Sequence, residues 1–201
     1  MNNPSLQNLL KFSEFIAQFR MVERTLYLER LKRDENDAEH CCVLALTAGY
    51  IIASEKLDLD VGKVMLYALA HDLVETYAGD TDAYSTDQNA HATKEVREHE
   101  ALLRIEKEFP EFPELIGALN KFEAKEDKEA RFVYALDKIQ PTIAVYLDGG
   151  YSWKKQGITL EQVITKKRDV IANADSLVFD YFNQLTALLK KEEIELFPQV
   201  Q

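Results

Sequence analysis

The stretch AEHCCVLALTAGYIIAS, residues 38–54, is apolar on nearly every side of a helix. A helix of that composition belongs at the centre of a bundle, because no face of it favours water. A second such stretch, VGKVMLYALAHDLVETYA at residues 61–78, follows Asp60 as an N-cap and ends at Gly79. We therefore expect a central pair of buried helices, the first beginning with Asp37 as its cap.

Helical periodicity continues through most of the remaining chain. Apolar residues at spacings of three and four predict helices over residues 6–19, 91–108, 114–122 and 128–147, and about 160–191. Residues 20–36 are rich in charge and are interpreted as a connector with room for a short helix, and residues 80–90 as a functional loop. The prediction is an all-α fold in a single domain, residues 1–201, with its motif core at about 20–145 and the helix at about 160–191 packing on that core.

Composition excludes several classes of partner. The chain has 201 residues and a formal net charge of −11, which disfavours a nucleic-acid polymer or an anionic membrane as its ligand. Its two cysteines are adjacent and cannot form a disulfide scaffold. With neither a basic leader followed by an apolar run nor a run of about 18 apolar residues, we expect a cytoplasmic protein without a membrane span.

A few polar residues interrupt the apolar helices. His71 and Asp72 are adjacent, and Asp137 lies within the apolar stretch RFVYALDKI. His40 falls in the first turn of its helix, where the helix dipole keeps an imidazole neutral and able to bind a metal. Two imidazoles and two carboxylates on three buried helices suit one divalent cation, since a buried carboxylate needs a cation or a dense hydrogen-bond network. By spacing alone, a core polar group with satisfied hydrogen bonds is an equally good interpretation of each residue.

The order of these residues has a counterpart in a known family. His40, the pair His71-Asp72 and Asp137 resemble the H…HD…D arrangement of HD-domain metal-dependent phosphohydrolases. Three longer strings resemble that family's bacterial 5′-deoxynucleotidase branch: RDENDAEH at 33–40, HDLVETYAGD at 71–80 and FEAKEDKEARFVYALDKI at 122–139. The resemblance covers roughly residues 20–145 and implies an HD-type helical bundle.

The resemblance also implies roles for individual residues. One divalent cation (Mn, Co, Mg, Fe, Ni or Zn) would be held by His40, His71, Asp72 and Asp137. Glu75 would act as the acid or base, with Asp80 as a second catalytic residue. The segment that opens the 80–90 loop would contact the nucleoside through Asp80, Thr81, Asp82 and Ala83. An arginine upstream of the first metal histidine would orient the phosphate: Arg24 is the best match, and Arg33 is a competitor.

The implied activity is a metal-dependent phosphomonoesterase that converts (deoxy)ribonucleoside 5′-monophosphates to nucleoside and phosphate. Helical enzymes of this family and size often form homodimers, and the sequence leaves the oligomeric state open. The nucleotidase branch has a tryptophan near its arginine, whereas Thr25, Leu26 and Tyr27 stand here and the single tryptophan is Trp153. The sequence therefore does not predict base or sugar preference. Two alternatives remain: a phosphohydrolase of the same family acting on nucleoside triphosphates, alarmones or non-nucleotide phosphates, and a non-enzymatic metal-holding ligand sensor.

Overall fold

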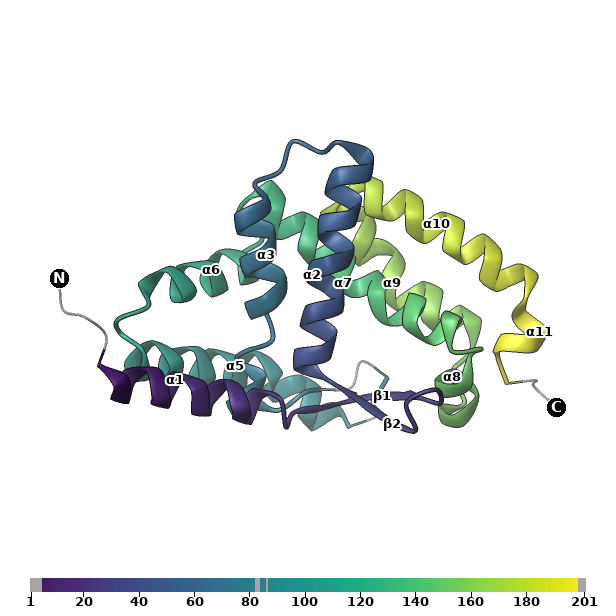
Figure 1. Ribbon diagram of the computed structural model, residues 1–201. Coiled ribbons are helices and arrows are strands. Elements are labelled where there is room, and N and C mark those ends of the chain that lie inside the picture. The colour runs from purple at the N-terminus through teal and green to yellow at the C-terminus, as the bar shows by residue number, and fades with distance from the viewer. Residues whose placement is uncertain (1–4, 82–83, 86, 199–201) are drawn as a thin grey trace.

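The computed structural model describes residues 5–81, 84–85 and 87–198 (Figure 1). Its elements in chain order are α1 (Leu6–Phe19), β1 (Glu23–Leu28), β2 (Arg33–Asn36), α2 (Asp37–Glu55), α3 (Val61–Ala70), α4 (Glu75–Ala78), α5 (Gln88–Glu108), α6 (Pro113–Glu123), α7 (Lys128–Leu147), α8 (Tyr151–Gln156), α9 (Leu160–Ala174), α10 (Ser176–Lys191) and α11 (Glu193–Leu196). The predicted all-α fold in one domain is confirmed. None of the helices within the described ranges is long and apolar enough to span a membrane.

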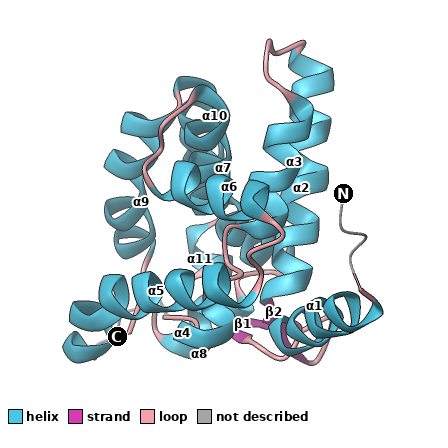
Figure 2. Cartoon of the chain, turned by 90° about the vertical axis from the view of Figure 1, so that its left-hand side faces the viewer, coloured by secondary structure: helices cyan, strands magenta, loops and turns pink. Residues whose placement is uncertain are grey.

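The centre of the molecule is formed by α2, α3 and α7. Leu44 of α2, Val64 of α3 and Val133 of α7 are fully buried in one hydrophobic cluster, which extends to α9 and α10. In the view of Figure 2, α9 lies to the left of α7, and α2 and α3 lie to its right. Both α9 and α10 contact α7. A second cluster joins α1, α5 and α6 through rings such as Phe15 and Phe109. The predicted central helix pair is present.

The expectation that α2 is buried all round is wrong for one side. Val43, Leu46 and Tyr50 recur at helical spacing, and their exposed fractions are 44%, 70% and 73%. These apolar side chains remain exposed to solvent, so the apolar composition of α2 overestimates how much of the helix is buried. The helix cap is also one residue earlier than expected: the Asn36 side chain accepts from the Glu39 backbone N–H, and Glu39 reciprocates.

Residues 20–36 do not form the expected connector with a short helix. β1 and β2 pair in an antiparallel hairpin, with Tyr27 opposite Asp34 and Leu28 opposite Arg33 (Figure 1). A two-stranded hairpin is only marginally stable by itself. This one is stabilised by later parts of the chain: the Gln156 side chain of α8 donates to the Thr25 carbonyl at 3.2 Å, and Asp148 accepts from the Glu29 backbone N–H at 2.7 Å.

The helix predicted over residues 61–78 is interrupted. α3 ends at Ala70, a turn covers residues 71–74, and α4 begins at Glu75. In the turn the backbone hydrogen bonds tighten, since Leu73 N–H donates to Ala70 and Glu75 N–H donates to Asp72. The consequence is that His71 and Glu75 are not simply one turn apart on a continuous helix.

The helix predicted over about 160–191 is two helices, α9 and α10. Asp175 separates them with an extended backbone, and its side chain accepts from the Val178 N–H at 3.0 Å. An aspartate that bonds the backbone two or three residues ahead starts a new helix more readily than it continues an old one. The break lets α9 and α10 pack against different parts of α7.

Candidate metal centre

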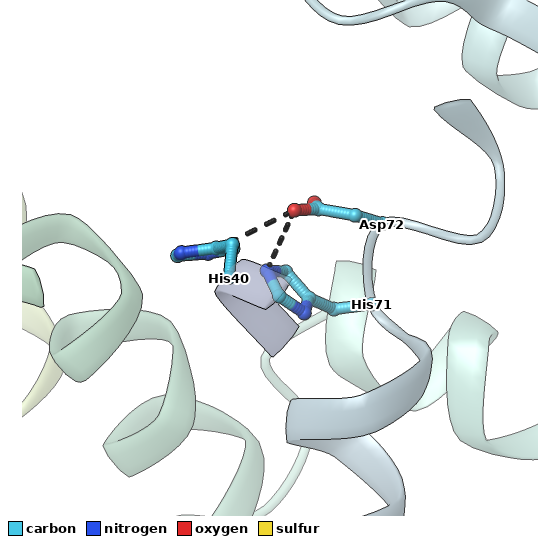
Figure 3. A group of neighbouring side chains, drawn as sticks. All are labelled: His40, His71 and Asp72. Atoms are coloured by element: carbon cyan, nitrogen blue, oxygen red, sulfur yellow. Dashed lines mark ion pairs between the residues drawn. The ribbon is translucent and has the colours of Figure 1, made fainter. Parts of the chain in front are cut away.

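Four predicted ligands come together where α2, α3 and α7 meet. His40 lies in the first turn of α2, His71 ends α3, Asp72 follows in the turn, and Asp137 lies midway along α7. The exposed fractions are 0% for His40 and 7% for both His71 and Asp137. Dashed lines in Figure 3 join the Asp72 carboxylate to both His40 and His71. The sequence-based grouping of these residues is reproduced by the fold.

The distances among the ligand atoms suit one small cation. His40 Nε2 lies 2.9 Å from Asp137 Oδ1, and His71 Nε2 lies 3.1 Å from Asp72 Oδ2. The cross distances are 3.5 Å from His71 Nε2 to Asp137 Oδ1 and 3.8 Å from His40 Nε2 to Asp72 Oδ2. Ligand atoms about 2.1 Å from a shared ion stand about 3.0 to 3.4 Å apart at octahedral or tetrahedral angles. The four side chains need only small shifts to share an ion.

The hydrogen bonds of Nδ1, the second ring nitrogen, decide which tautomer each histidine adopts. His40 Nδ1 is 3.0 Å from the Gln140 side-chain oxygen, and His71 Nδ1 is 3.2 Å from the Ala68 carbonyl. Carbonyl oxygens only accept, so each neutral ring carries its proton on Nδ1 and presents a lone pair at Nε2. Within the described part of the chain, buried His71 Nε2 has no hydrogen-bond partner. Lone pairs that face carboxylate oxygens repel unless a cation lies between them, and therefore the residues present fit a divalent metal.

Gln140 is expected to matter for metal affinity through His40. Replacing it with leucine removes the acceptor that orients the ring, which should weaken metal binding about 10- to 100-fold. Competition with a chromophoric chelator measures that affinity. Gln140→Glu is the matched control, because a carboxylate still accepts from Nδ1–H. Wild-type affinity in Gln140→Leu would contradict the role.

Arg24 of β1 lies beside the ligand cluster. One of its terminal nitrogens donates to Asp72 Oδ2 at 3.0 Å and to Asp37 Oδ1 at 3.2 Å, and its Nε is 3.7 Å from Glu35. In the absence of a metal, burial alone would lower the pKa of His71, but Asp72 raises it well above its usual value. Burial alone would raise the pKa of Asp72, but the protonated His71 ring, and then Arg24, hold it well below its usual range. Burial, together with neighbouring Asp72, raises the pKa of Asp37 to about 6. Arg24, on strand β1 of the hairpin, thus places a guanidinium group in direct contact with these carboxylates.

Glu75 begins α4, and its carboxylate lies within 4.8 Å of ligand atoms of Asp37 and Asp72. Its exposed fraction is 4%, and one carboxylate oxygen, Oε2, is buried with no hydrogen-bond partner among the described residues. Burial, followed by Asp72, Asp37 and Asp80, raises the pKa of Glu75 well above its usual range. A carboxyl group in this environment favours its protonated form.

The remaining predicted residues divide into three groups. Asp80 and Thr81 line the cavity that also holds Arg24 and Glu75. Asp82 and Ala83 lie outside the described residues. Arg33 is not brought to the cluster: it pairs with Glu39 at 2.8 Å, is exposed, and lines neither of the two cavities below.

Two cavities meet at the ligand cluster. One of about 410 Å³ includes Arg24 and Asp80, and another of about 710 Å³ includes Glu98 and His99. They share a wall made of Asp72, Glu75, Lys94, Tyr134, Asp137 and Lys138. The centre is therefore accessible to small molecules from two directions.

Sequence reasoning missed several residues of this region. Gln140 carries a usable signal, because it follows Asp137 by three residues and so shares its helix face. Asp37 was expected only as a helix cap, yet it is fully buried and contacts Arg24. Lys138 follows Asp137 directly and donates to its Oδ2 at 2.7 Å, a contact that helical spacing does not indicate.

Comparison with known proteins is consistent with this geometry. A family model described as "HD domain" matches residues 16–178. No curated protein matches the chain. Among solved structures, one from Magnetospirillum magnetotacticum MS-1, described as a predicted metal-dependent phosphohydrolase, is 28% identical with a TM-score of 0.79, over 98% of this chain and 100% of that one. A conserved hypothetical protein from Pyrococcus furiosus is 15% identical with a TM-score of 0.61, over 93% and 99% respectively, and supports the fold alone.

Proposed function

Because the chain belongs to the HD-domain family, we propose that it is a metal-dependent phosphohydrolase acting on small nucleotides. We propose (deoxy)ribonucleoside 5′-monophosphates as substrates, with nucleoside and phosphate as products. The observation that carries the proposal is the convergence of two Nε2 lone pairs and two carboxylates beside Arg24 and Glu75. The Magnetospirillum protein's description as a predicted metal-dependent phosphohydrolase supports it further.

The proposed centre would hold its cation through His40, His71, Asp72 and Asp137. A divalent cation supplies positive charge that polarises a phosphate ester and makes water more acidic. Two nitrogen and two oxygen ligands are compatible with Mn, Co, Mg, Fe, Ni or Zn. The ligand set does not favour a thiolate-binding metal, and the nearby thiol of Cys41 has its pKa raised by burial.

Arg24 and Glu75 would supply the remaining chemistry. The Arg24 guanidinium, held by Asp72 and Asp37, would orient the phosphoryl oxygens in the cavity that it lines. Glu75, whose Oε2 has no partner among the described residues, would hold the proton exchanged with water or with the leaving oxygen. Asp80 and Thr81 line the same cavity and would contact the nucleoside.

A panel of nucleotides tests this function directly. We expect metal-dependent phosphate release from nucleoside 5′-monophosphates in the presence of Mn, Co or Mg, and its loss on chelation. A malachite-green assay measures the phosphate. Release of pyrophosphate or triphosphate instead would favour the alternative substrates within the family, and no release from any nucleotide would overturn the proposal.

A further inference from the structure

The cavity of about 410 Å³ is lined by five lysine and arginine side chains as well as by the carboxylates of Asp72, Glu75, Asp80 and Asp137. Besides Arg24 and Lys94, it is lined by Lys138 of α7 and by Lys166 and Lys167 of α9. In a chain with 35 acidic and 24 basic residues, such a gathering of cations is not what composition predicts. The lysines of α9 take no part in the mechanism described above.

The contacts of these lysines can be followed outward from the metal ligand Asp137. Lys138 Nζ donates to Asp137 Oδ2 at 2.7 Å, and Lys167 Nζ donates to the Lys138 carbonyl at 2.7 Å. Lys166 Nζ lies 5.1 Å from the centre of the Tyr84 ring. The three ammonium groups thus extend from the metal ligand Asp137 to the edge of α9.

Lys166 of α9 is exposed, and Lys167 beside it is half-buried. Among the carboxylates of the described residues, none lies within ion-pair distance, 4.0 Å, of either Nζ. Burial lowers the pKa of Lys167 to about 7, although Asp137 acts in the opposite direction. Because the carboxylates that line the cavity lie beyond ion-pair distance from both lysines, an anion that enters beside Lys167 favours the protonated form of its side chain.

We propose that Lys166 and Lys167, adjoining Lys138, form a second phosphoryl-binding subsite, so that the preferred substrates are nucleotides carrying two phosphoryl groups. This rests on the proposed function, in which Arg24 and the metal ligands take the first phosphoryl group. Once an entering anion favours the protonated form of Lys167, two adjacent ammonium groups match the charge of a phosphate dianion, for which lysine is a common partner. A cavity of this volume lies within the range of pockets that enclose ligands of nucleotide size.

The second phosphoryl group can be attached at either of two positions of the nucleotide, and the same lysines would recognise it at both. It is attached to the first in a 5′-diphosphate and to the other side of the ribose in a 3′,5′-bisphosphate. Binding of the 5′-monophosphate, the 5′-diphosphate and the 3′,5′-bisphosphate should therefore be compared, in both the adenosine and the uridine series. Isothermal titration of the full chain in the presence of a chelator measures affinity without turnover.

We expect the diphosphate or the bisphosphate to bind at least about 10-fold more tightly than the monophosphate. The double variant Lys166→Gln/Lys167→Gln should remove that preference while changing monophosphate affinity less than about twofold. Lys190→Gln/Lys191→Gln is the matched control, since these are adjacent exposed lysines at the end of α10 that line neither cavity.

Equal affinities within both series, no measurable binding in either, or a preference that survives the double variant would overturn the subsite. These outcomes differ from failure of the proposed function. If the binding preference is found but no nucleotide is hydrolysed with any metal, the subsite stands and the enzymatic proposal fails. If monophosphates are hydrolysed and no preference is found, the enzymatic proposal stands and the subsite fails.

Discussion

Asp72→Ala is expected to abolish metal binding and to lower kcat/KM by about a thousandfold or more, since a catalytic cation contributes several kcal/mol. Asp72 Oδ2 is close to both histidine Nε2 atoms and accepts from Arg24, so one substitution removes a ligand and the partner of the arginine. Metal content after desalting, measured by mass spectrometry, and phosphate release measure the two effects.

A loss of folding would produce the same loss of activity, so the variant needs a control. Asp180→Ala removes an exposed carboxylate on α10 and should change neither metal content nor turnover. Circular dichroism and the melting temperature report whether Asp72→Ala keeps the helical fold. A folded Asp72→Ala protein with full metal content and undiminished turnover would refute the proposed ligand set.

Glu75→Gln should separate catalysis from metal binding. Glu75 is not among the four proposed ligands, so the variant is expected to keep its metal and its fold. Turnover should fall about 10²- to 10⁴-fold, because glutamine cannot exchange the proton that the carboxyl group holds. Steady-state kinetics and metal analysis of the same preparation measure both quantities.

This comparison also decides between an enzyme and a metal-holding ligand sensor. Glu100→Gln, an exposed change on α5, is the control and should behave as wild type. A sensor without catalysis predicts that Glu75→Gln alters no measurable behaviour. Retained metal with lost turnover excludes the sensor, whereas undiminished turnover removes Glu75 from the mechanism.

The metal ligands could be predicted from sequence because their context is local. His71, Asp72 and Asp137 are polar residues within apolar helical stretches, and burial of such groups requires a cation or partners. His40 could be placed because its position in the first turn of α2 follows from the helix start. Helical periodicity thus placed these side chains on buried helices, whereas their assignment to one metal site depended on the resemblance to the HD-domain family.

Other parts of the site depend on contacts between distant residues. Arg24 reaches Asp72 from a hairpin that was not predicted, because Gln156 and Asp148, more than 100 residues later, stabilise it. Lys167 belongs to a helix whose lysines resemble a solvated face in the sequence. Only the packing of α9 on α7 shows that Lys167 contacts the backbone of Lys138. Local pattern distinguishes polar from apolar faces, but it does not distinguish solvent from a polar cavity.

The ligand arrangement has a thermodynamic consequence. His40, His71 and Asp137 are separated by long stretches of sequence, and the unfolded chain has no reason to keep them together. An ion that binds only the folded form adds RT ln(1 + [M]/Kd) to the free energy of unfolding, which is about 2.7 kcal/mol at a hundredfold excess over Kd. Through this linkage, the availability of the metal in its surroundings sets how much of the protein is folded as well as how much is active.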